Sequence, residues 1–301
     1  MPEPINPFKS GFVAVVGRPN AGKSTLVNAL VGEKVSIVTA VAQTTRNRIL
    51  GIVNRPQAQV ILMDTPGIHR PLSRLNEQMM GFVREALAER DLALLIVDAS
   101  ARFGKGDEFA VQLVKDHATR SILLLNKIDK VYKPKLLPLI DRYARLHNFE
   151  EVYPVSALKG MNLDEVLEAV IARLPEGPAF FPPEIYTDQP ERFLASEMIR
   201  EQVIRKTRQE LPYVSAVLVE RFEESEAITR IYATILVERE SQKPIVIGAA
   251  GSRIKQIGIE ARQELEKVFP PKVFLELFVR VEPNWRDSDS MVAALDYRNE
   301  S

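Results

Sequence analysis

Apolar runs and amphipathic stretches alternate along residues 1–175. The apolar runs predict strands at Gly11–Val16, Gln59–Met63, Leu92–Val97, Ser121–Leu125 and Glu151–Val155. Apolar residues at helical spacing predict helices at Ser24–Val31, Leu75–Glu89, Phe109–Asp116, Pro138–Leu146 and Leu163–Leu174. This alternation is typical of a mostly parallel sheet covered by helices, in which almost purely aliphatic runs form the buried strands.

The pattern is interrupted at Leu174–Glu184, which holds four prolines and a glycine. Such a composition disfavours regular structure and indicates a linker, onto which Phe180 and Phe181 could dock. We therefore expect a first domain over residues 1–175, a linker over 176–191, a second domain over 192–284 and a tail over 285–301.

The second domain has the pattern of a small α+β unit. Its predicted elements are a helix at Glu191–Glu210, strands at Val214–Glu220 and Ile231–Val237, a short helix at Ile245–Ile247, a helix at Ser252–Val268 and a strand at Val273–Val281. The acidic turn Glu223–Glu226 separates the first two strands, and Pro270-Pro271 breaks the chain before the last strand.

Composition excludes several classes of protein. The 301 residues contain no cysteine, which rules out a disulfide framework, a thiolate metal site and a cysteine nucleophile. No apolar run approaches the ~20 residues of a membrane span, and residues 1–10 lack a signal-peptide pattern. We expect a soluble cytoplasmic protein without an integral membrane segment.

The net charge gives no indication of a nucleic-acid partner, because the charges of 40 basic and 40 acidic residues cancel. Residues 181–301 are even slightly acidic, with 17 Lys and Arg against 21 Asp and Glu. Between Ser241 and Ile259, however, Lys243, Arg253 and Lys255 occur with no acidic residue. Any nucleic-acid site in the second domain must rely on this local charge.

A phosphate-binding loop follows the first predicted strand. The segment Gly17–Ser24 matches G-x-x-x-x-G-K-[ST] and opens a predicted helix, so its N–H groups can point at phosphate oxygens. Lys23 would reach the β- and γ-phosphates and Ser24 would hold Mg²⁺; a chance Gly-Lys turn is the disfavoured alternative. The predicted contacts are Gly17, Arg18, Pro19, Asn20, Ala21, Gly22, Lys23, Ser24 and Thr25.

Two further loops select the nucleotide. Asp129 closes the segment Asn126–Asp129 directly after an aliphatic strand, where its carboxylate can accept two N–H bonds from guanine but not from adenine. A polar turn at a strand end is the alternative. The segment Ser156-Ala157-Leu158 could brace the base, and Asn126 and Lys127 complete the predicted contacts to GTP or GDP.

A third segment, Asp64-Thr65-Pro66-Gly67, ends the strand Gln59–Met63. Asp64 can orient Mg²⁺ through water, and the Gly67 N–H can bond the γ-phosphate. Thr44 and Thr45 lie before that strand, where a threonine can cap the metal when GTP is bound. The predicted metal-binding residues are therefore Ser24, Thr44, Thr45 and Asp64.

Together the motifs GRPNAGKS, QTTRNR, DTPG, NKID and SAL, followed by VIGAAGSRIKQIG, resemble the TRAFAC class of GTPases and within it the Era family. This resemblance implies a P-loop GTPase domain followed by a smaller type II KH domain. It also implies slow, Mg²⁺-dependent GTP hydrolysis and binding to the 3′ end of 16S ribosomal RNA. The cellular role implied is in biogenesis of the small (30S) ribosomal subunit and in rRNA processing.

The same resemblance implies a peripheral association with the inner face of the cell membrane, for which the composition gives no support. We expect a monomer.

The residue that activates water is not evident. Ras-like GTPases place a glutamine just after the DxxG segment, but here that position is Ile68, and we interpret the following His69 as a loop residue. Relatives without the glutamine use K⁺ held by an asparagine that matches Asn20. We therefore expect slow turnover that K⁺ or bound RNA accelerates, with Asn20, Lys23, Thr44, Thr45 and Gly67 contributing to catalysis.

The loop Gly248–Gly251 has the GXXG form with which KH modules clamp single-stranded nucleic acid. The predicted RNA contacts are Lys243, Ile247, Gly248, Ala249, Ala250, Gly251, Ser252, Arg253, Ile254 and Lys255. A plain glycine turn before a helix capped by Ser252 is the alternative. Trp285 could stack on a base, but we expect it to pack on its own domain.

Two other functions fit parts of this pattern. One is an RNA-binding scaffold with a vestigial nucleotide domain, which the intact Lys23, Ser24, Asp64 and Asp129 disfavour. The other is a GTPase that signals to protein partners and uses the second domain for docking.

Overall fold

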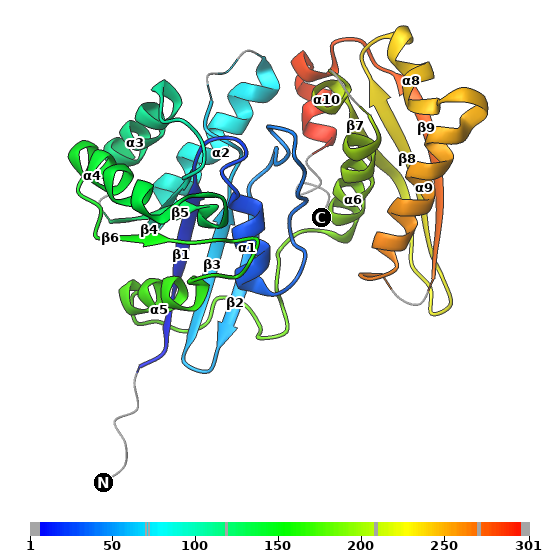
Figure 1. The fold of residues 1–301 in the computed structure, drawn as a ribbon. Helices are drawn as coiled ribbons and strands as arrows, with labels where there is room; N and C mark the ends of the chain where they lie inside the picture. Colours follow the sequence, from blue (N-terminus) through cyan, green and yellow to red (C-terminus); the bar gives the residue numbers. More distant parts are fainter. Residues whose placement is uncertain are drawn as a thin grey trace. The chain divides into compact units, whose positions relative to one another are not determined.

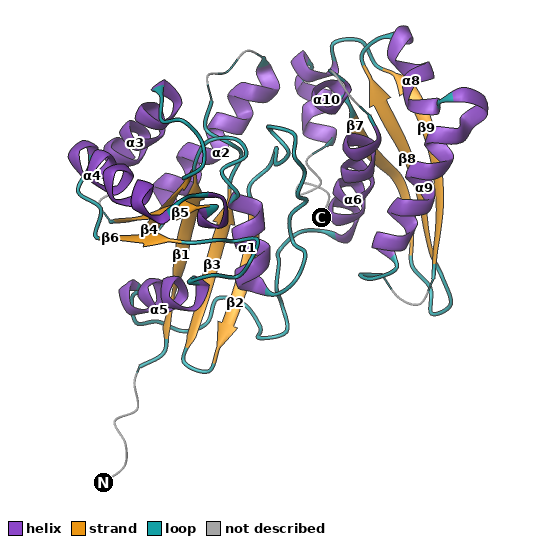
Figure 2. Ribbon diagram, viewed as in Figure 1, coloured by secondary structure: helices purple, strands orange, loops and turns teal. Residues whose placement is uncertain are grey.

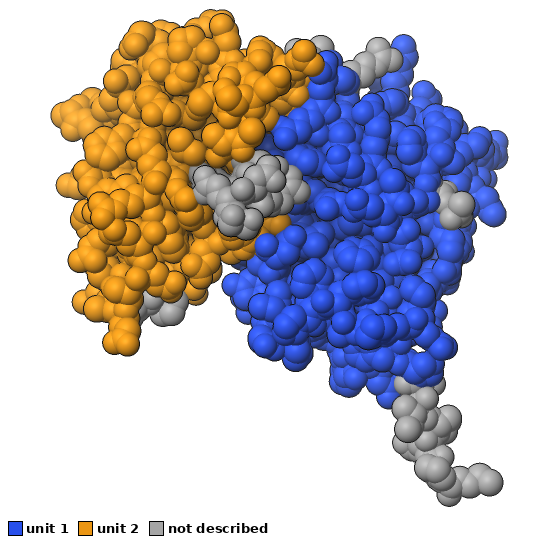
Figure 3. Space-filling model, turned by 180° about the vertical axis from the view of Figure 1, so that it is seen from behind, with its two compact units in different colours: residues 1–36, 42–71, 77–188 blue, residues 37–41, 72–76, 189–301 orange. Residues whose placement is uncertain are grey.

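The computed structural model describes residues 7–69, 71, 73–117, 120–207, 210–269 and 272–295. The predicted Pro270-Pro271 break, the first six residues and the last six residues of the tail lie outside these ranges. The chain forms two compact units, which Figure 3 colours separately. Unit 1 comprises residues 1–36, 42–71 and 77–188, and unit 2 comprises residues 37–41, 72–76 and 189–301.

Unit 1 is built on a six-stranded sheet in the order β2-β3-β1-β4-β5-β6. Only the β2–β3 pair is antiparallel. The strands are β1 (Lys9–Val16), β2 (Ile49–Arg55), β3 (Ala58–Asp64), β4 (Leu92–Asp98), β5 (Ser121–Asn126) and β6 (Glu151–Pro154). The helices are α1 (Lys23–Val31), α2 (Arg74–Glu89), α3 (Lys105–His117), α4 (Leu136–Leu146) and α5 (Leu163–Arg173).

Helices cover both faces of this sheet (Figure 1). Val13 and Val15 of β1 pack in a core cluster with α1 and α5, whereas Ala14 and Val16 pack in a second cluster with α2, α3 and α4. This is the two-residue period of a strand that is buried on both sides. The carboxyl ends of the parallel strands therefore meet at one edge, where the sequence motifs are located.

Strand β2 was absent from the sequence prediction. Residues 49–53 are apolar but include Gly51, which weakens a strand signal. The structure gives the reason for this glycine, since a Cβ atom there would lie 2.7 Å from Val27 and 2.9 Å from Val31 of α1. The missing side chain lets α1 pack closely on the sheet.

The proline-rich linker contains no helix or strand and docks onto unit 1 through both phenylalanines. The Phe180 ring meets the edge of Phe12 at 4.9 Å between centroids, and Phe181 packs on the core. The buried amide of Gln59 accepts the N–H groups of Phe180 and Phe181 at 2.7 and 2.9 Å and donates to the Phe181 carbonyl at 2.8 Å.

Unit 2 contains a three-stranded sheet in the order β7-β8-β9 (Figure 2). Strands β7 and β8 are antiparallel and β8 and β9 are parallel. The elements are α6 (Glu191–Lys206), α7 (Leu211–Val214), β7 (Ala216–Glu223), β8 (Thr229–Val237), α8 (Lys243–Ile247), α9 (Ser252–Leu265), β9 (Val273–Val281) and α10 (Asp289–Ala294).

Some predicted boundaries in unit 2 were wrong. The first helix ends at Lys206 rather than Glu210, because Thr207 turns to an extended backbone, and Val214 ends a short helix instead of starting a strand. Trp285 is fully buried and donates its indole N–H to the Val214 carbonyl at 2.8 Å. The expected packing of Trp285 on its own domain is confirmed, and the ring is not accessible to a base.

Two short segments from the GTPase motif region group with unit 2, namely residues 37–41 and 72–76. Within that unit the Val38 N–H donates to the buried carboxylate of Glu201 on α6 at 3.2 Å. The first segment lies between α1 and Thr45, and the second follows Gly67.

Replacing Gln59 with Met should destabilise unit 1 by about 1–3 kcal/mol, because the linker N–H groups would remain buried without an acceptor. Urea unfolding of the full chain measures this loss. The matched control is Gln57→Met in the exposed turn, which should change the free energy of unfolding little. Equal losses in the two variants would contradict the docking role of Gln59.

Candidate functional site

The phosphate-binding loop lies where β1 passes into α1. Gly22 has φ of 102°, and a Cβ atom there would lie only 2.2 Å from the side-chain nitrogen of Asn126. The Asn126 amide uses that space to donate to the Ala21 carbonyl at 2.8 Å, while its oxygen accepts the Ala157 N–H at 2.9 Å. One buried side chain thus joins the phosphate loop to both loops predicted to bind guanine.

Lys23 is the buried cation of the site. Its ammonium donates to the carbonyls of Gly17 and Arg18 at 3.3 and 3.2 Å. Burial lowers the pKa of Lys23 to about 8, against the opposing effect of the Asp64 charge. A phosphate group beside this ammonium would raise the pKa again, so the loop holds a cation that an anion stabilises.

The predicted metal-binding groups gather beside Lys23. The Ser24 and Thr45 hydroxyls lie 2.8 Å apart, so the structure brings Thr45 rather than Thr44 against Ser24. Asp64 is fully buried, and neither carboxylate oxygen makes a hydrogen bond of good geometry among the described residues. Burial raises the pKa of Asp64, opposed by the nearby Lys23 charge.

This donor set fits Mg²⁺. The buried Asp64 carboxylate, without a hydrogen bond of good geometry, lies near the Ser24 hydroxyl, which in turn contacts the Thr45 hydroxyl. Mg²⁺ prefers such oxygen ligands. Within the described residues no group of three or more His, Cys, Asp or Glu side chains could hold a metal ion alone. Mg²⁺ here would therefore complete its shell with water and phosphate oxygens, as it does with nucleotides.

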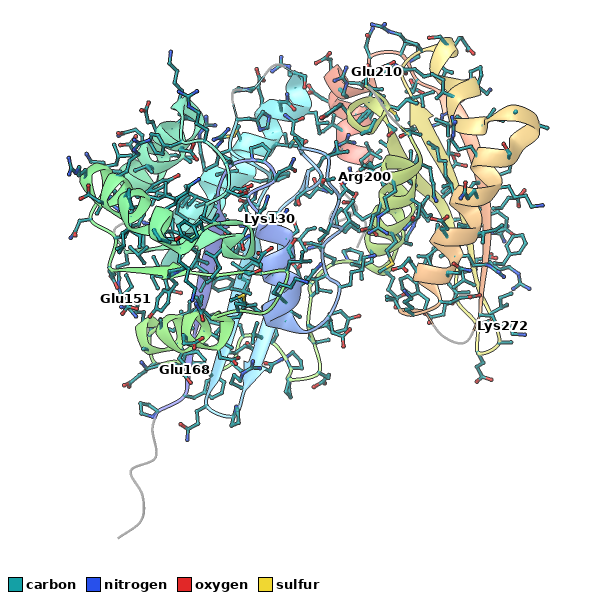
Figure 4. All side chains as sticks on the ribbon, viewed as in Figure 1. Lys130, Glu151, Glu168, Arg200, Glu210 and Lys272 are labelled. Atoms are coloured by element: carbon teal, nitrogen blue, oxygen red, sulfur yellow. The ribbon has the colours of Figure 1, made fainter. Side chains whose placement is uncertain are left out.

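The predicted guanine-binding loops are fastened at the same edge. The Ser156 hydroxyl donates to one oxygen of the exposed Asp129 carboxylate at 2.6 Å. Lys127, with φ of 65°, donates to the Asn20 carbonyl at 2.6 Å and to Asp98 at 2.7 Å. Lys130 marks this edge in Figure 4, whereas Glu168 of α5 lies toward the other end of the sheet. Leu158 is 71% exposed, on a loop that could border a base.

The segment after β3 is held against the phosphate loop. The Thr65 hydroxyl donates to the Val15 carbonyl at 2.8 Å, and the Ile68 N–H donates to the Gly17 carbonyl at 2.9 Å. Ile68 is buried in the core, so its side chain cannot orient water. His69 contacts the Gly67 carbonyl through Nδ1 at 2.6 Å, in keeping with a loop residue.

Sequence reasoning missed Asp98, which fixes Lys127 and thereby the guanine-binding loop. A signal was present, because Asp98 ends a parallel strand and lies opposite Asn126 in the register of β4 and β5. Polar residues at the carboxyl ends of neighbouring parallel strands converge on one crevice.

The glycine loop of unit 2 joins α8 to α9 through left-handed residues. Gly248 and Gly251 both have φ of 77°, and Ala250 between them has φ of 48°. A Cβ atom on Gly248 would lie 2.7 Å from Arg253, whereas one on Gly251 would meet nothing within 4 Å. Gly251 rather than Ser252 occupies the N-cap position of α9, without a side-chain bond, so the helix capped by Ser252 that the disfavoured alternative required is not formed.

The cations around this loop differ in availability. Arg253 donates to the Ile245 carbonyl and so braces α8 against α9. Lys255 is exposed and Lys243 is half-buried. The residues Ile247, Ala249, Ala250, Ser252 and Ile254 are all at least partly accessible along the loop and its two flanking helices.

A groove of about 470 Å³ continues from the loop between α9 and β9. Ile254, Lys255 and Ile259 line it from α9, together with Arg262, and the first half of β9 forms the other wall. Sequence reasoning missed Ile259 and Arg262, although both follow Lys255 at helical spacing. The groove is largely apolar and carries the cations of Lys255 and Arg262 beside one carboxylate, that of Glu276. Apolar surface with cations suits unpaired bases and phosphates.

Among the described residues no helix is long and apolar enough to cross a membrane.

Comparisons with known families match both units. Residues 12–127 match the family model described as 50S ribosome-binding GTPase, and residues 210–286 match the KH domain model. GTPase Era of Syntrophus aciditrophicus (strain SB) is 48% identical over 292 residues, which are 96% of this chain and 95% of that protein. GTPase Era of Geobacter metallireducens is 47% identical over 294 residues, which are 97% and 99% of the two chains.

Solved structures with this fold include two of Era. The crystal structure of Era in complex with MgGDPNP and nucleotides 1506–1542 of 16S ribosomal RNA gives a TM-score of 0.93 at 42% identity, over 96% of this chain and 99% of that one. The crystal structure of an Aquifex aeolicus Era variant bound to GDP and AlF₄⁻ gives 0.92 at 42% identity, over the same shares. The chain belongs to the Era family, with a GTPase domain followed by a KH domain.

Proposed function

We propose that this GTPase binds the 3′ end of 16S ribosomal RNA through its KH domain and assists assembly of the small (30S) subunit, with GTP and Mg²⁺ controlling the interaction. The observation that carries the proposal is the junction at Asn126, which ties the phosphate loop to the guanine-binding loops in a chain that also carries an open GXXG groove. The related Era structure, which contains MgGDPNP and 16S RNA nucleotides, supports it.

The nucleotide would be held at both ends. Asp129 accepts the guanine N1–H and exocyclic amine, while the loop N–H groups and Lys23 bind the phosphates. Ser24, Thr45 and Asp64 would hold Mg²⁺, directly or through water. The bound Mg²⁺ supplies neutralisation of the charge that develops on the phosphates during hydrolysis.

Hydrolysis would be slow because the position of the usual glutamine is taken by the buried Ile68. K⁺ held near Asn20 is the supplementary charge that we propose. Asn20 is exposed on the phosphate loop with φ of 62°.

RNA would enter the groove of unit 2. Gly248 and Gly251 allow the loop backbone to approach the sugar–phosphate chain closely. The bases would lie on Ile254 and Ile259, and Lys255 and Arg262 would neutralise phosphates. This gives a local site within a domain of acidic composition.

Nucleotide state can reach unit 2 through the chain itself. Residues 37–41 pack within unit 2, where Val38 binds Glu201, and the same segment leads to Thr45 at the metal site. If Thr45 binds Mg²⁺ only with GTP, the position of this segment depends on the nucleotide. Such differential binding is what a switch requires.

A peripheral association with a membrane, which the family resemblance also implies, is supported by no feature of the described residues, and we do not propose it. The monomeric state stays a prediction.

Asp129→Asn should reduce GTP affinity at least about 100-fold, because an acceptor for two guanine donors is replaced by a mixed group. Xanthosine triphosphate should bind the variant better than GTP, since its 2-carbonyl can accept from the new amide. The Asn oxygen retains the contact with Ser156. Titration calorimetry measures both affinities, with the exposed Asp141→Asn as a matched control. Unchanged GTP affinity in Asp129→Asn would exclude the guanine role.

Single-turnover hydrolysis should be faster in KCl than in NaCl of equal concentration. Asn20→Gly removes the proposed K⁺ ligand while allowing the left-handed backbone, and should abolish this difference. Equal rates of the unaltered protein in the two salts would eliminate K⁺ from the proposal.

Gly248→Asp and Gly251→Asp should weaken binding of an oligonucleotide from the 3′ end of 16S RNA more than about tenfold, because a carboxylate repels the phosphate backbone. Hydrolysis without RNA should be retained. Gly32→Asp is the matched control for Gly251→Asp, since Gly32 also has positive φ and open space but lies in unit 1. Fluorescence anisotropy reports the affinities.

The same assay separates the alternatives. A switch requires different RNA affinities with GDP and with GDPNP. Equal affinities would favour the RNA-binding scaffold. Unchanged RNA binding in both glycine variants would favour a GTPase that signals to protein partners.

A further inference from the structure

The side chain of Arg18 leaves the phosphate loop and reaches helix α3. Its guanidinium donates to Asp107 in the first turn of α3 at 2.6 Å. The Arg18 side chain is 40% exposed, whereas that of Asp107 is only 7% exposed. The pair therefore links a partly exposed residue of the nucleotide site to a fixed carboxylate in the core.

The carboxylate of Asp107 accepts further hydrogen bonds besides the one from Arg18. It accepts the Gly104 N–H at 2.9 Å and the hydroxyl of the buried Tyr143 of α4 at 3.1 Å. Burial and the neighbouring Asp107 charge raise the pKa of Tyr143 far above its usual range, so this hydroxyl stays protonated and donates. The acceptor for Arg18 cannot move without breaking these bonds.

The surroundings leave room for the arginine in this position. A Cβ atom on Gly106 would lie 2.8 Å from Nε of Arg18, so the guanidinium lies over a residue without a side chain. Phe103 supports Tyr143 from the same loop, with ring centroids 5.4 Å apart. The beginning of α3 and the middle of α4 are thus built around a residue of the phosphate loop.

The backbone of Arg18 and its neighbour controls groups that face the phosphates. The Arg18 carbonyl accepts from the Lys23 ammonium at 3.2 Å. Pro19 packs against Gly67 so closely that a Cβ on Gly67 would lie 2.7 Å from it. Fixing Arg18 therefore fixes Lys23, assigned above to the β- and γ-phosphates, and the place available to Gly67, assigned to the γ-phosphate.

We propose that Arg18 is a positioning residue for GTP hydrolysis, which acts through Asp107 to hold the first half of the phosphate loop against α3. This inference rests on the proposed function of the site. The guanine base is bound elsewhere, by Asp129 on a loop joined through Asn126. GDP also lacks the γ-phosphate that the Gly67 N–H would bond. We therefore expect loss of the Arg18–Asp107 pair to affect the hydrolytic step much more than GDP affinity.

The experiment compares Arg18→Gln, Asp107→Asn and the double variant of the full chain with Mg²⁺. Each single variant should slow single-turnover hydrolysis by about tenfold or more, since small misplacements in a reacting geometry are costly. GDP affinity should stay within about threefold of the unaltered protein. The double variant should be no slower than the slower single variant, because both break the same link.

Arg120→Gln is the matched control, because Arg120 is 43% exposed and binds Glu150 at 2.9 Å, and this ion pair contacts no predicted nucleotide-binding residue. Its hydrolysis rate should equal that of the unaltered protein. Arg18→Lys keeps the charge and should recover part of the rate lost in Arg18→Gln.

An equal fall of GDP affinity and rate in Arg18→Gln would overturn the inference, as would losses that multiply in the double variant. So would full activity of Arg18→Gln. Because Arg18 is partly exposed, this variant tests the idea even if Asp107→Asn fails to fold. Failure of the unaltered protein to hydrolyse GTP would instead refute the proposed function.

Discussion

The nucleotide site depends on the two hydrogen bonds of the Asn126 amide. Its nitrogen binds the phosphate loop at Ala21 and its oxygen binds Ala157, so three sequence segments that are far apart become one rigid rim. The arrangement requires Gly22, since any side chain there would occupy the space of the amide. Because both hydrogen bonds are buried, the loss of either partner would leave a buried polar group without a hydrogen bond, which is costly. This cost favours the one arrangement in which both bonds form.

Two charged side chains, Lys23 and Asp64, are buried at the centre of the rim. Burial lowers the pKa of Lys23 and raises that of Asp64, so it favours the neutral form of each. Burial of these two charges is unfavourable by itself. A bound phosphate anion would stabilise the Lys23 ammonium, and a bound metal cation would stabilise the Asp64 carboxylate. The carbonyls of Gly17 and Arg18 already hold the Lys23 ammonium in place, which is a feature of a preorganised polar site.

The two units support their functional loops in different ways. Unit 1 holds its functional loops through buried side chains, and the Arg18–Asp107–Tyr143 chain extends that support to α3 and α4. Unit 2 offers an open groove whose loop is shaped by glycine φ angles and braced by Arg253. The chain segment 37–41 belongs to the packing of unit 2 although it lies between motifs of unit 1.

The local motifs could be identified from the sequence because each is contiguous and its chemistry depends on backbone form and spacing. The GXXXXGK[ST] loop, the Asn126–Asp129 segment and the GXXG loop were all recognisable, as was the alternation of strands and helices. What the sequence could not decide were contacts between distant residues. It did not tell which of Thr44 and Thr45 contacts Ser24, missed β2, and gave no reason for Asp98 or Asp107. Only the tertiary structure decided these points, because a hydrogen bond across 89 residues between Arg18 and Asp107 leaves no local periodicity.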